Sequence, residues 1–172
     1  MKNNTTLVQK AKCGDTEAFA SLYREVYEDL YRFALYILKN PADAQDTVSD
    51  TVMDAFASIH KLRKNEAFKS WIFRILSNKC RKKLKEYTQR PAQLEESKAE
   101  WDAHFTKGGV EEDAQIRMLF MELPQEERMI IAMHLFGGFT CKEIARQLHM
   151  NENTVRSKES RALKKMREQW EQ

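Results

Sequence analysis

The fold of this chain is decided by one stretch, residues 139–166, FTCKEIARQLHMNENTVRSKESRALKKM. Its pattern predicts a helix, a short break and a second helix. Thr140 stands three residues before Glu143, the spacing of a capping box, in which hydroxyl and carboxylate each bond a backbone N–H left free at the helix start. Asn151 or Asn153 can cap the second helix, which starts near Thr154. This pattern favours a helix-turn-helix, whose second helix enters the DNA major groove.

Each of the two helices has one apolar face. Ile144, Ala145 and Leu148 form that face in the first helix. The second helix is expected to bury Val155, Ala162, Leu163 and Met166. Its opposite face is polar and basic, with Arg156, Ser157, Ser160, Arg161 and Lys164. An ordinary antiparallel helix pair with a solvated basic face is the alternative at this point.

The composition is that of a globular, mostly helical protein. Among 172 residues, 42% are hydrophobic and 32% charged, with only five Gly and three Pro. No apolar run is long enough to span a membrane, and the N-terminus lacks the apolar core of a signal peptide, so a cytoplasmic protein is expected. Three widely spaced cysteines form no CxxC pair and four histidines are scattered, so we expect free thiols, no metal site and no cofactor.

Charge is arranged in alternating blocks along the chain. Residues 61–90 are rich in Lys and Arg against only Glu66 and Glu86, whereas residues 41–60 contain several Asp and no Lys or Arg. Residues 95–113 are acidic, and the last helices are basic again. The blocks suggest two surfaces that face nucleic acid, each leaving another surface for a protein partner.

The periodicity predicts an all-α fold of two small helical domains joined by an acidic linker. The expected domains are residues 1–89, with a linker over 90–109, and residues 110–172, which contain the helix-turn-helix. Helices are expected over residues 5–12, 15–39, 42–60, 68–87, 110–123 and 125–136, with a tight basic loop over 62–67. Phe56 is expected in the buried stripe of the third helix.

Three stretches in this order resemble one family. They are NPADAQDTVSDTVMDAFASIHKL (40–62), AFKSWIFRILSNKCRKKLKEY (67–87) and LPQEERMIIAMHLFGGFTCKEIARQLHMNENTVRSKESRALKKMR (123–167). Together they resemble bacterial RNA polymerase sigma factors of the extracytoplasmic-function (ECF) group. The resemblance implies a protein that binds core RNA polymerase and directs promoter-specific transcription initiation without catalysing a reaction. The first domain would grip the polymerase clamp and open the minus-ten element, and the second would read the minus-thirty-five element.

The resemblance assigns polymerase binding to an acidic helix face with Asp46, Ser49, Asp50 and Met53. Carboxylates among apolar residues suit a basic coiled-coil partner, where charge sets orientation and association rate more than affinity. The family usually has a Gln-Glu pair where this chain has Ser49-Asp50. A solvated acidic face is the alternative.

Minus-ten recognition requires a pocket for an unstacked base and positive charge along the strand. By resemblance, Asn78 contacts the extruded base, and a basic loop completes its pocket. The expected loop residues are Arg63, Lys64, Asn65 and Phe68, and the expected phosphate contacts are Lys79, Arg81, Lys82 and Lys83. Trp71 could stack on a base, but its spacing with Ile72 and Ile75 favours the core.

Minus-thirty-five recognition falls on the second helix of the helix-turn-helix. By resemblance, the residues facing the groove are Arg156, Ser157, Ser160 and Arg161, with Lys164 on the same basic face and Lys142 and Arg146 as backbone contacts. Glu159 departs from the family, which has an apolar residue there. It could be exposed, pair with Lys158 or Arg156, or loosen the seat of the helix.

The partners that the resemblance implies are core RNA polymerase, promoter DNA and an anti-sigma factor, which in this family is often membrane-anchored; no small-molecule substrate is expected. A stand-alone helix-turn-helix regulator is the main alternative, but a two-component or quorum-type regulator would need a sensing domain upstream. An RNA-binding adaptor using residues 79–90 would not need the helix-turn-helix. An enzyme is not expected, because the chain has no Gly-rich phosphate loop, nucleophile elbow, HExxH motif or credible triad.

Overall fold

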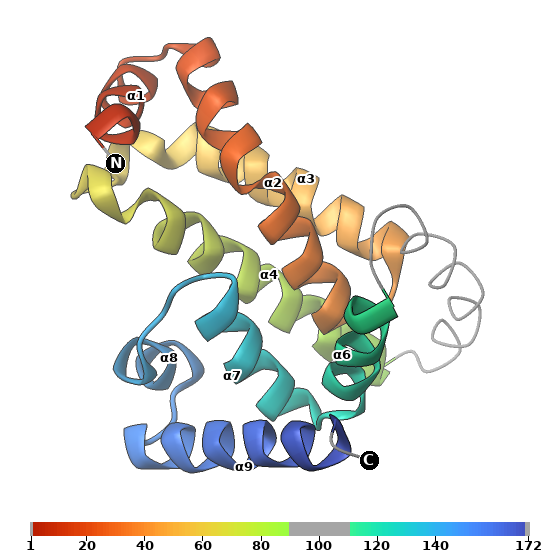
Figure 1. Ribbon diagram of the computed structural model, residues 1–172. Helices are drawn as coiled ribbons and strands as arrows, with labels where there is room; N and C mark the ends of the chain where they lie inside the picture. Colours follow the sequence, from red (N-terminus) through yellow and green to blue (C-terminus); the bar gives the residue numbers. More distant parts are fainter. Residues whose placement is uncertain (1, 90–110, 171–172) are drawn as a thin grey trace.

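The computed structural model describes residues 2–89 and 111–170, all of whose regular elements are helical (Figure 1). The expected linker therefore lies outside the described residues. The first domain contains α1 (Lys2–Lys12), α2 (Thr16–Leu38), α3 (Pro41–Ser58) and α4 (Phe68–Gln89). The second contains α6 (Glu111–Glu122), α7 (Gln125–Leu135), α8 (Cys141–Leu148) and α9 (Glu152–Trp170).

The long helices of the first domain begin and end where their capping residues dictate. Asp15 Oδ1 accepts the Ala18 N–H at 3.0 Å and starts α2, which ends at Lys39 in a left-handed conformation (φ 57°). Asn40 Oδ1 then accepts the Asp43 N–H at 3.0 Å, and Pro41 at the first helical position starts α3. The Asn40-Pro41 pair therefore both ends α2 and starts α3.

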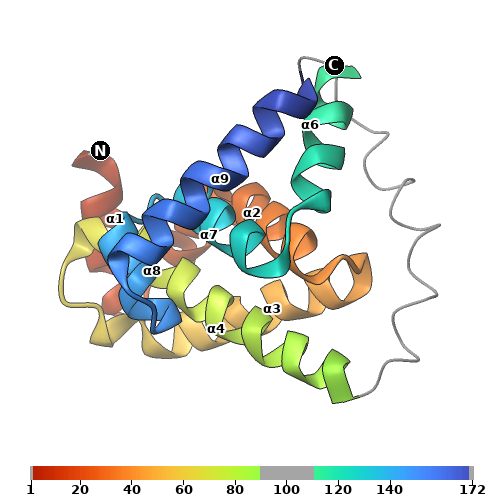
Figure 2. The same ribbon diagram turned by 90° about the horizontal axis from the view of Figure 1, so that it is seen from below.

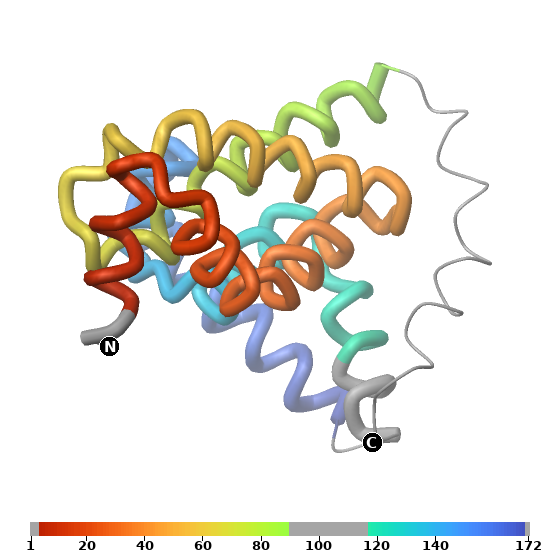
Figure 3. Tube along the Cα trace, turned by 90° about the horizontal axis from the view of Figure 1, so that it is seen from above, coloured from red at the N-terminus to blue at the C-terminus, as the bar shows by residue number. Residues whose placement is uncertain are grey.

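The connection from α3 to α4 contains more helix than the sequence predicted. A single-turn 3₁₀ helix, Asn65–Ala67, lies where a tight basic loop was expected over 62–67, and a second one, Ile59–Lys61, follows α3 where the predicted helix was to continue to residue 60. Helix α1 packs on both turns (Figure 3). The loop expected to form part of a base pocket is thus held against the N-terminal helix.

A buried arginine and a glycine shape the second domain. Arg128 is buried, and its Nη1 donates to the carbonyls of Leu123 at 3.0 Å and Met121 at 3.3 Å, so it joins the start of α7 to the end of α6. Burial lowers the pKa of Arg128 to about 10. At Gly137 a Cβ atom would lie 2.5 Å from the Phe139 ring and 2.9 Å from the Met133 carbonyl oxygen, so the chain passes from α7 to α8 only with glycine here.

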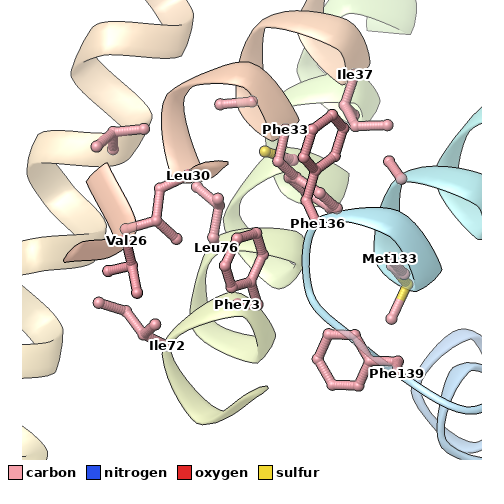
Figure 4. Close-up of a cluster of buried hydrophobic side chains, with 14 of the residues drawn as sticks. Val26, Leu30, Phe33, Ile37, Ile72, Phe73, Leu76, Met133, Phe136 and Phe139 are labelled. Carbon is pink, nitrogen blue, oxygen red and sulfur yellow. The ribbon is translucent and has the colours of Figure 1, made fainter. Parts of the chain in front are cut away.

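The two helical domains share one continuous hydrophobic core. The Tyr36 ring of α2 lies 4.9 Å from the Phe120 ring of α6 and 5.8 Å from the ring of Phe136, the residue that follows α7, centroid to centroid. Phe33 of α2 meets Phe73 of α4 edge-on at 5.7 Å. Figure 4 shows this cluster passing from α2 and α4 to α7 without a break. The shared core holds α8 beside α4 and leaves α9 along the outer edge (Figures 1 and 2).

No helix within residues 2–89 or 111–170 combines the length and apolar character needed to cross a membrane.

Candidate nucleic-acid interface

Helix α8 is fixed at both of its ends. The predicted capping box is confirmed: Thr140 Oγ1 accepts the Glu143 N–H at 3.3 Å, and Glu143 Oε2 accepts the Thr140 N–H at 2.8 Å. The hydrogen bonds from the Thr140 backbone and hydroxyl lower the pKa of Glu143. The helix ends at His149 in a left-handed conformation (φ 57°), whose N–H bonds the Ala145 carbonyl. The first helix of the helix-turn-helix is therefore a rigid platform for the second.

Helix α9 lies on the outer side of the molecule (Figure 2), and the basic side chains Arg156, Arg161 and Lys164 along it are exposed. Asn151 caps the N-terminus of α9, since its Oδ1 accepts the Asn153 N–H at 2.8 Å. On the inner face of α9, Val155 and Ala162 are fully buried. Leu163, expected in the buried stripe, is 50% exposed. The seven residues proposed for the minus-thirty-five element are all exposed: Lys142, Arg146, Arg156, Ser157, Ser160, Arg161 and Lys164.

Ion pairs along the exposed face of α9 are local and weak. Arg156 Nη2 lies 2.7 Å from Glu152 Oε1, and Lys164 Nζ lies 3.6 Å from Glu168 Oε1, both pairs one helical turn apart. Exposed pairs of this kind contribute little to stability because solvent screens them, so these cations can exchange a carboxylate for a phosphate at little cost.

The neighbouring residues Lys158 and Glu159 point away from this face. Lys158 Nζ pairs with Glu126 Oε2 of α7 at 2.8 Å, so it is not the partner of Glu159. Glu159 instead turns inward and contacts Cys141 and His134. Two of the alternatives predicted for Glu159, an exposed side chain and an ion pair with Lys158, are therefore wrong.

The loop before α4 is partly engaged inside the protein. Arg63 and Lys64 are exposed, but Asn65 Oδ1 accepts a hydrogen bond from Lys12 Nζ of α1 at 3.2 Å. Phe68 is buried, with its ring 6.4 Å from Phe19 in an edge-on contact, because it begins α4 on the core side. Phe68 therefore supports the loop from below in this arrangement, which differs from the expected role in the base pocket.

Asn78 lies in a cavity between α4 and α8. The cavity has a volume of about 430 Å³ and is lined by Arg74, Asn78, Glu143, Arg146, Gln147 and His149. Arg81 Nη1 donates to the Gln147 carbonyl at 2.9 Å, while Gln147 Nε2 donates to the Arg74 carbonyl at 3.3 Å and to Ser77 Oγ. The proposed base contact thus faces the helix-turn-helix domain.

The remaining cations of α4 divide into paired and exposed. Lys79 Nζ lies 2.7 Å from Asp54 Oδ2, and Lys83 Nζ lies 2.9 Å from Asp43 Oδ1, which raises the pKa of Lys83. Lys82 is exposed. The carboxylates of α3 therefore neutralise part of the predicted phosphate-binding row.

Trp71 belongs to the core side of α4, as its spacing favoured. It is partly buried against the main cluster, and its ring lies 6.2 Å from that of Phe68.

One face of α3 is acidic, apolar and open to solvent. Asp46, Ser49 and Asp50 are exposed, and Met53 is 70% exposed. Phe56, which was expected in the core, is 42% exposed and continues this face one turn further. Helical spacing could have indicated its membership of this face, since Phe56 stands three residues after Met53 and seven after Ser49.

Comparisons with known proteins identify the family of this chain. The family models for Sigma-70 region 2 and Sigma-70, region 4 match residues 22–90 and 113–166. The chain is 31% identical to the RNA polymerase sigma factor SigV of Bacillus subtilis over 143 residues, which are 81% of this chain and 83% of SigV. The chain is an ECF sigma factor. It directs transcription initiation by RNA polymerase and is not an enzyme.

Further relatives agree with this assignment. The sigma factor is 29% identical to the ECF RNA polymerase sigma factor SigM of Mycobacterium tuberculosis over 162 residues, covering 94% of this chain and 81% of SigM. Its fold is similar to CnrH in a complex with the cytosolic domain of CnrY, with a TM-score of 0.67, 22% identity and coverage of 98% and 97%. It is also similar to RpoE of Bartonella quintana in a complex with the anti-sigma factor NepR, with a TM-score of 0.70, 21% identity and coverage of 91% and 98%.

Proposed function

We propose that this sigma factor uses three surfaces, which lie on α9, on α4 with the loop before it, and on α3. Residues 1–89 bind core RNA polymerase and open the minus-ten element, residues 110–172 read the minus-thirty-five element, and residues 90–109 connect them. The observation that supports the proposal most strongly is the outward basic face of α9, seated on Val155 and Ala162 and preceded by a capped α8.

Helix α9 reads the minus-thirty-five element in the major groove. Arg156, Ser157, Ser160 and Arg161 meet base edges or phosphates, and Lys142, Arg146 and Lys164 hold the backbone. The exposure of all seven side chains supports this role.

The loop and α4 hold the unstacked minus-ten strand. Asn78 contacts the extruded base, Arg63, Lys64 and Asn65 border its pocket, and Lys79, Arg81, Lys82 and Lys83 hold phosphates. Because Arg81 and Asn78 face α8 in this structure, α8 leaves α4 before the strand binds. Phe68 supports this loop from the core.

The exposed face of α3 binds the polymerase clamp. Asp46, Ser49, Asp50 and Met53 form its centre and Phe56 extends it, so that charge sets orientation around an apolar middle. The protein works in the cytoplasm, where its polymerase and promoters are.

An anti-sigma factor, membrane-anchored as is often the case in the family, restrains this sigma factor until a signal releases it. Similarity in fold to RpoE, solved with the anti-sigma factor NepR, and to CnrH, solved with the cytosolic domain of CnrY, supports this part of the proposal.

Run-off transcription tests the proposal. Purified bacterial core polymerase transcribes a genomic fragment library with and without the protein. We expect new start sites that share two spaced upstream motifs. Duplex binding without core binding and without new starts would instead identify a stand-alone helix-turn-helix regulator.

A further inference from the structure

Glu159 occupies a position of α9 that faces the interior of the helix-turn-helix domain. Val155, Glu159 and Ala162 are spaced four and three residues apart, which places them on one helix face. Val155 and Ala162 are fully buried, and the side chain of Glu159 is only 16% exposed. The buried face of α9 that packs on the rest of the domain therefore contains a carboxylate.

The two carboxylate oxygens of Glu159 contact two neighbouring helices, α8 and α7. Oε2 accepts a hydrogen bond from the Cys141 thiol, at 3.1 Å from Sγ, and Cys141 is the first residue of α8. Oε1 lies 3.4 Å from Nδ1 of His134, in the last turn of α7. One side chain therefore joins α7, α8 and α9.

The two neighbouring cations of α9 form their ion pairs with other carboxylates, although the charge of Arg156 also acts on Cys141 and Glu159. Lys158 is directed to Glu126 of α7, and Arg156 is paired with Glu152 on its own helix. The hydrogen bond to Glu159 raises the pKa of Cys141, which keeps the thiol protonated and able to donate.

The polar contacts of Glu159 restrict the orientation of α9 more than they stabilise the fold. Burying a carboxylate is unfavourable unless it is hydrogen-bonded, and a thiol is a weak donor, so an apolar side chain here would be at least as stable. An apolar contact, however, tolerates small rotations of a helix about its axis, whereas two polar contacts to separate helices restrict them. Arg156 and Ser160 flank Glu159 on α9, so the rotation of α9 decides where they point.

We propose that Glu159 is a positioning residue for promoter reading: through Cys141 and His134 it fixes the rotation of α9 and so aims Arg156 and Ser160 at the groove. This inference rests on the proposed role of α9 in the minus-thirty-five element. It assigns a function to one of the residues at which this chain departs from the family pattern.

The test compares Glu159→Leu with Glu159→Gln in the full chain bound to core polymerase. Glu168→Leu is the matched control, since Glu168 is an exposed glutamate on the same helix. The readout is the ratio of transcription from a promoter with the preferred minus-thirty-five element to transcription from variants with one base changed. Thermal unfolding and binding to core polymerase are measured in parallel.

Glu159→Leu is expected to leave the melting temperature unchanged or higher and core binding intact, yet to reduce base discrimination about tenfold, the cost of one lost base contact. Glu159→Gln retains an acceptor for Cys141 and is expected to restore most of the discrimination. Cys141→Ala, which removes only the thiol, is expected to lose part of it, and Glu168→Leu none.

Unchanged discrimination in Glu159→Leu overturns the inference. So does a loss that follows the melting temperature equally in Glu159→Leu and Glu159→Gln, because the residue would then be merely structural. If the unmodified protein supports no promoter-dependent transcript, the proposed function itself fails. A transcribing protein with an unaffected Glu159→Leu variant loses only this inference.

Discussion

Helices α4 and α9 are both rich in Lys and Arg, but the fold treats their charges differently. On α4, Lys79 and Lys83 are paired with carboxylates of α3, and Arg81 donates to a carbonyl of α8. On α9, Arg156 and Lys164 pair with residues of their own helix and remain exposed. A basic helix is therefore available to nucleic acid only where no neighbouring element already uses its cations.

Under the proposed assignment, this difference separates the two promoter elements. The exposed cations of α9 would meet a duplex without a rearrangement, whereas α4 would first exchange its contacts with α3 and α8 for contacts with a single strand. We therefore expect duplex reading to need no rearrangement and strand capture to follow a movement of α8.

The largest effect is expected from the core that joins the two regions. Phe33→Ala removes a fully buried ring in contact with Phe73 and should lower the free energy of unfolding by about 3–5 kcal/mol. Hydrogen exchange resolved by helix should show α4 and α9 losing protection together. Phe56→Ala, at a half-exposed phenylalanine, is the control and should cost far less. Retained protection in α7–α9 of Phe33→Ala would show that the two regions are separate units.

Reversal of one charge on α3 should affect polymerase and not DNA. Asp50→Lys places a cation where a basic partner is proposed, so core binding should fall about a hundredfold, while binding to a minus-thirty-five duplex stays unchanged. Fluorescence anisotropy measures both affinities. Glu28→Lys, on α2, carries the same charge change as a control. Equal losses in the two variants would point to a net-charge effect and against a docking face.

The converse is expected from α9. Arg161→Ala should weaken promoter binding about tenfold and leave core binding intact, because it removes one groove-facing cation. Lys165→Ala, on the same helix, is the control, and electrophoretic mobility shifts measure the effect. If Arg161→Ala lost polymerase binding in step with promoter binding, the division of labour would be wrong.

The capping box at the start of α8 is expected to contribute to the stability of the helix-turn-helix domain. Thr140→Ala should reduce the free energy of unfolding by about 1 kcal/mol at neutral pH. The pKa of Glu143 is lowered in the folded protein, so its stabilisation is present above the ordinary carboxyl pKa and lost as pH falls through the lowered value. Urea unfolding should therefore show the difference between the unmodified protein and Glu143→Gln shrinking in acid. A difference that persisted or grew there would contradict the box, and Thr154→Ala is the control for Thr140→Ala.

The smallest effect tests whether α3 shields α4. Asp54→Asn removes the exposed partner of Lys79 and should strengthen binding to a single-stranded minus-ten oligonucleotide by about two- to threefold at low salt. Asp29→Asn, which breaks the exposed pair with Lys69, is the control and should change little. Equal strengthening in both would mean that net charge alone is responsible.

Local signals in the sequence predicted most of the fold. Thr140 caps its helix as the capping-box spacing predicted, because a capping side chain bonds backbone groups only two or three residues away. The break expected at Asn40-Pro41 is also present, and there Asn40 caps the helix that follows. The helix-turn-helix and the burial of Val155 and Ala162 followed from the same short-range periodicity.

Contacts between distant parts of the chain could not be predicted in this way. Periodicity placed Phe56 and Leu163 in the core, yet both are about half exposed, because which edge of a stripe is covered depends on the helix packed against it. Nothing in the sequence indicated that Arg81 bonds Gln147 or that Glu159 bonds Cys141, since these pairs form only after the elements pack.

The most direct test introduces a photo-crosslinking side chain in place of Asn78 and, separately, in place of Arg156. In the complex with core polymerase and promoter, position 78 should crosslink to the minus-ten strand and position 156 to the minus-thirty-five duplex. In the free protein, position 78 should crosslink to α8 instead. Crosslinks from position 78 that stay on α8 in the promoter complex, or crosslinks from both positions to one element, would contradict the account.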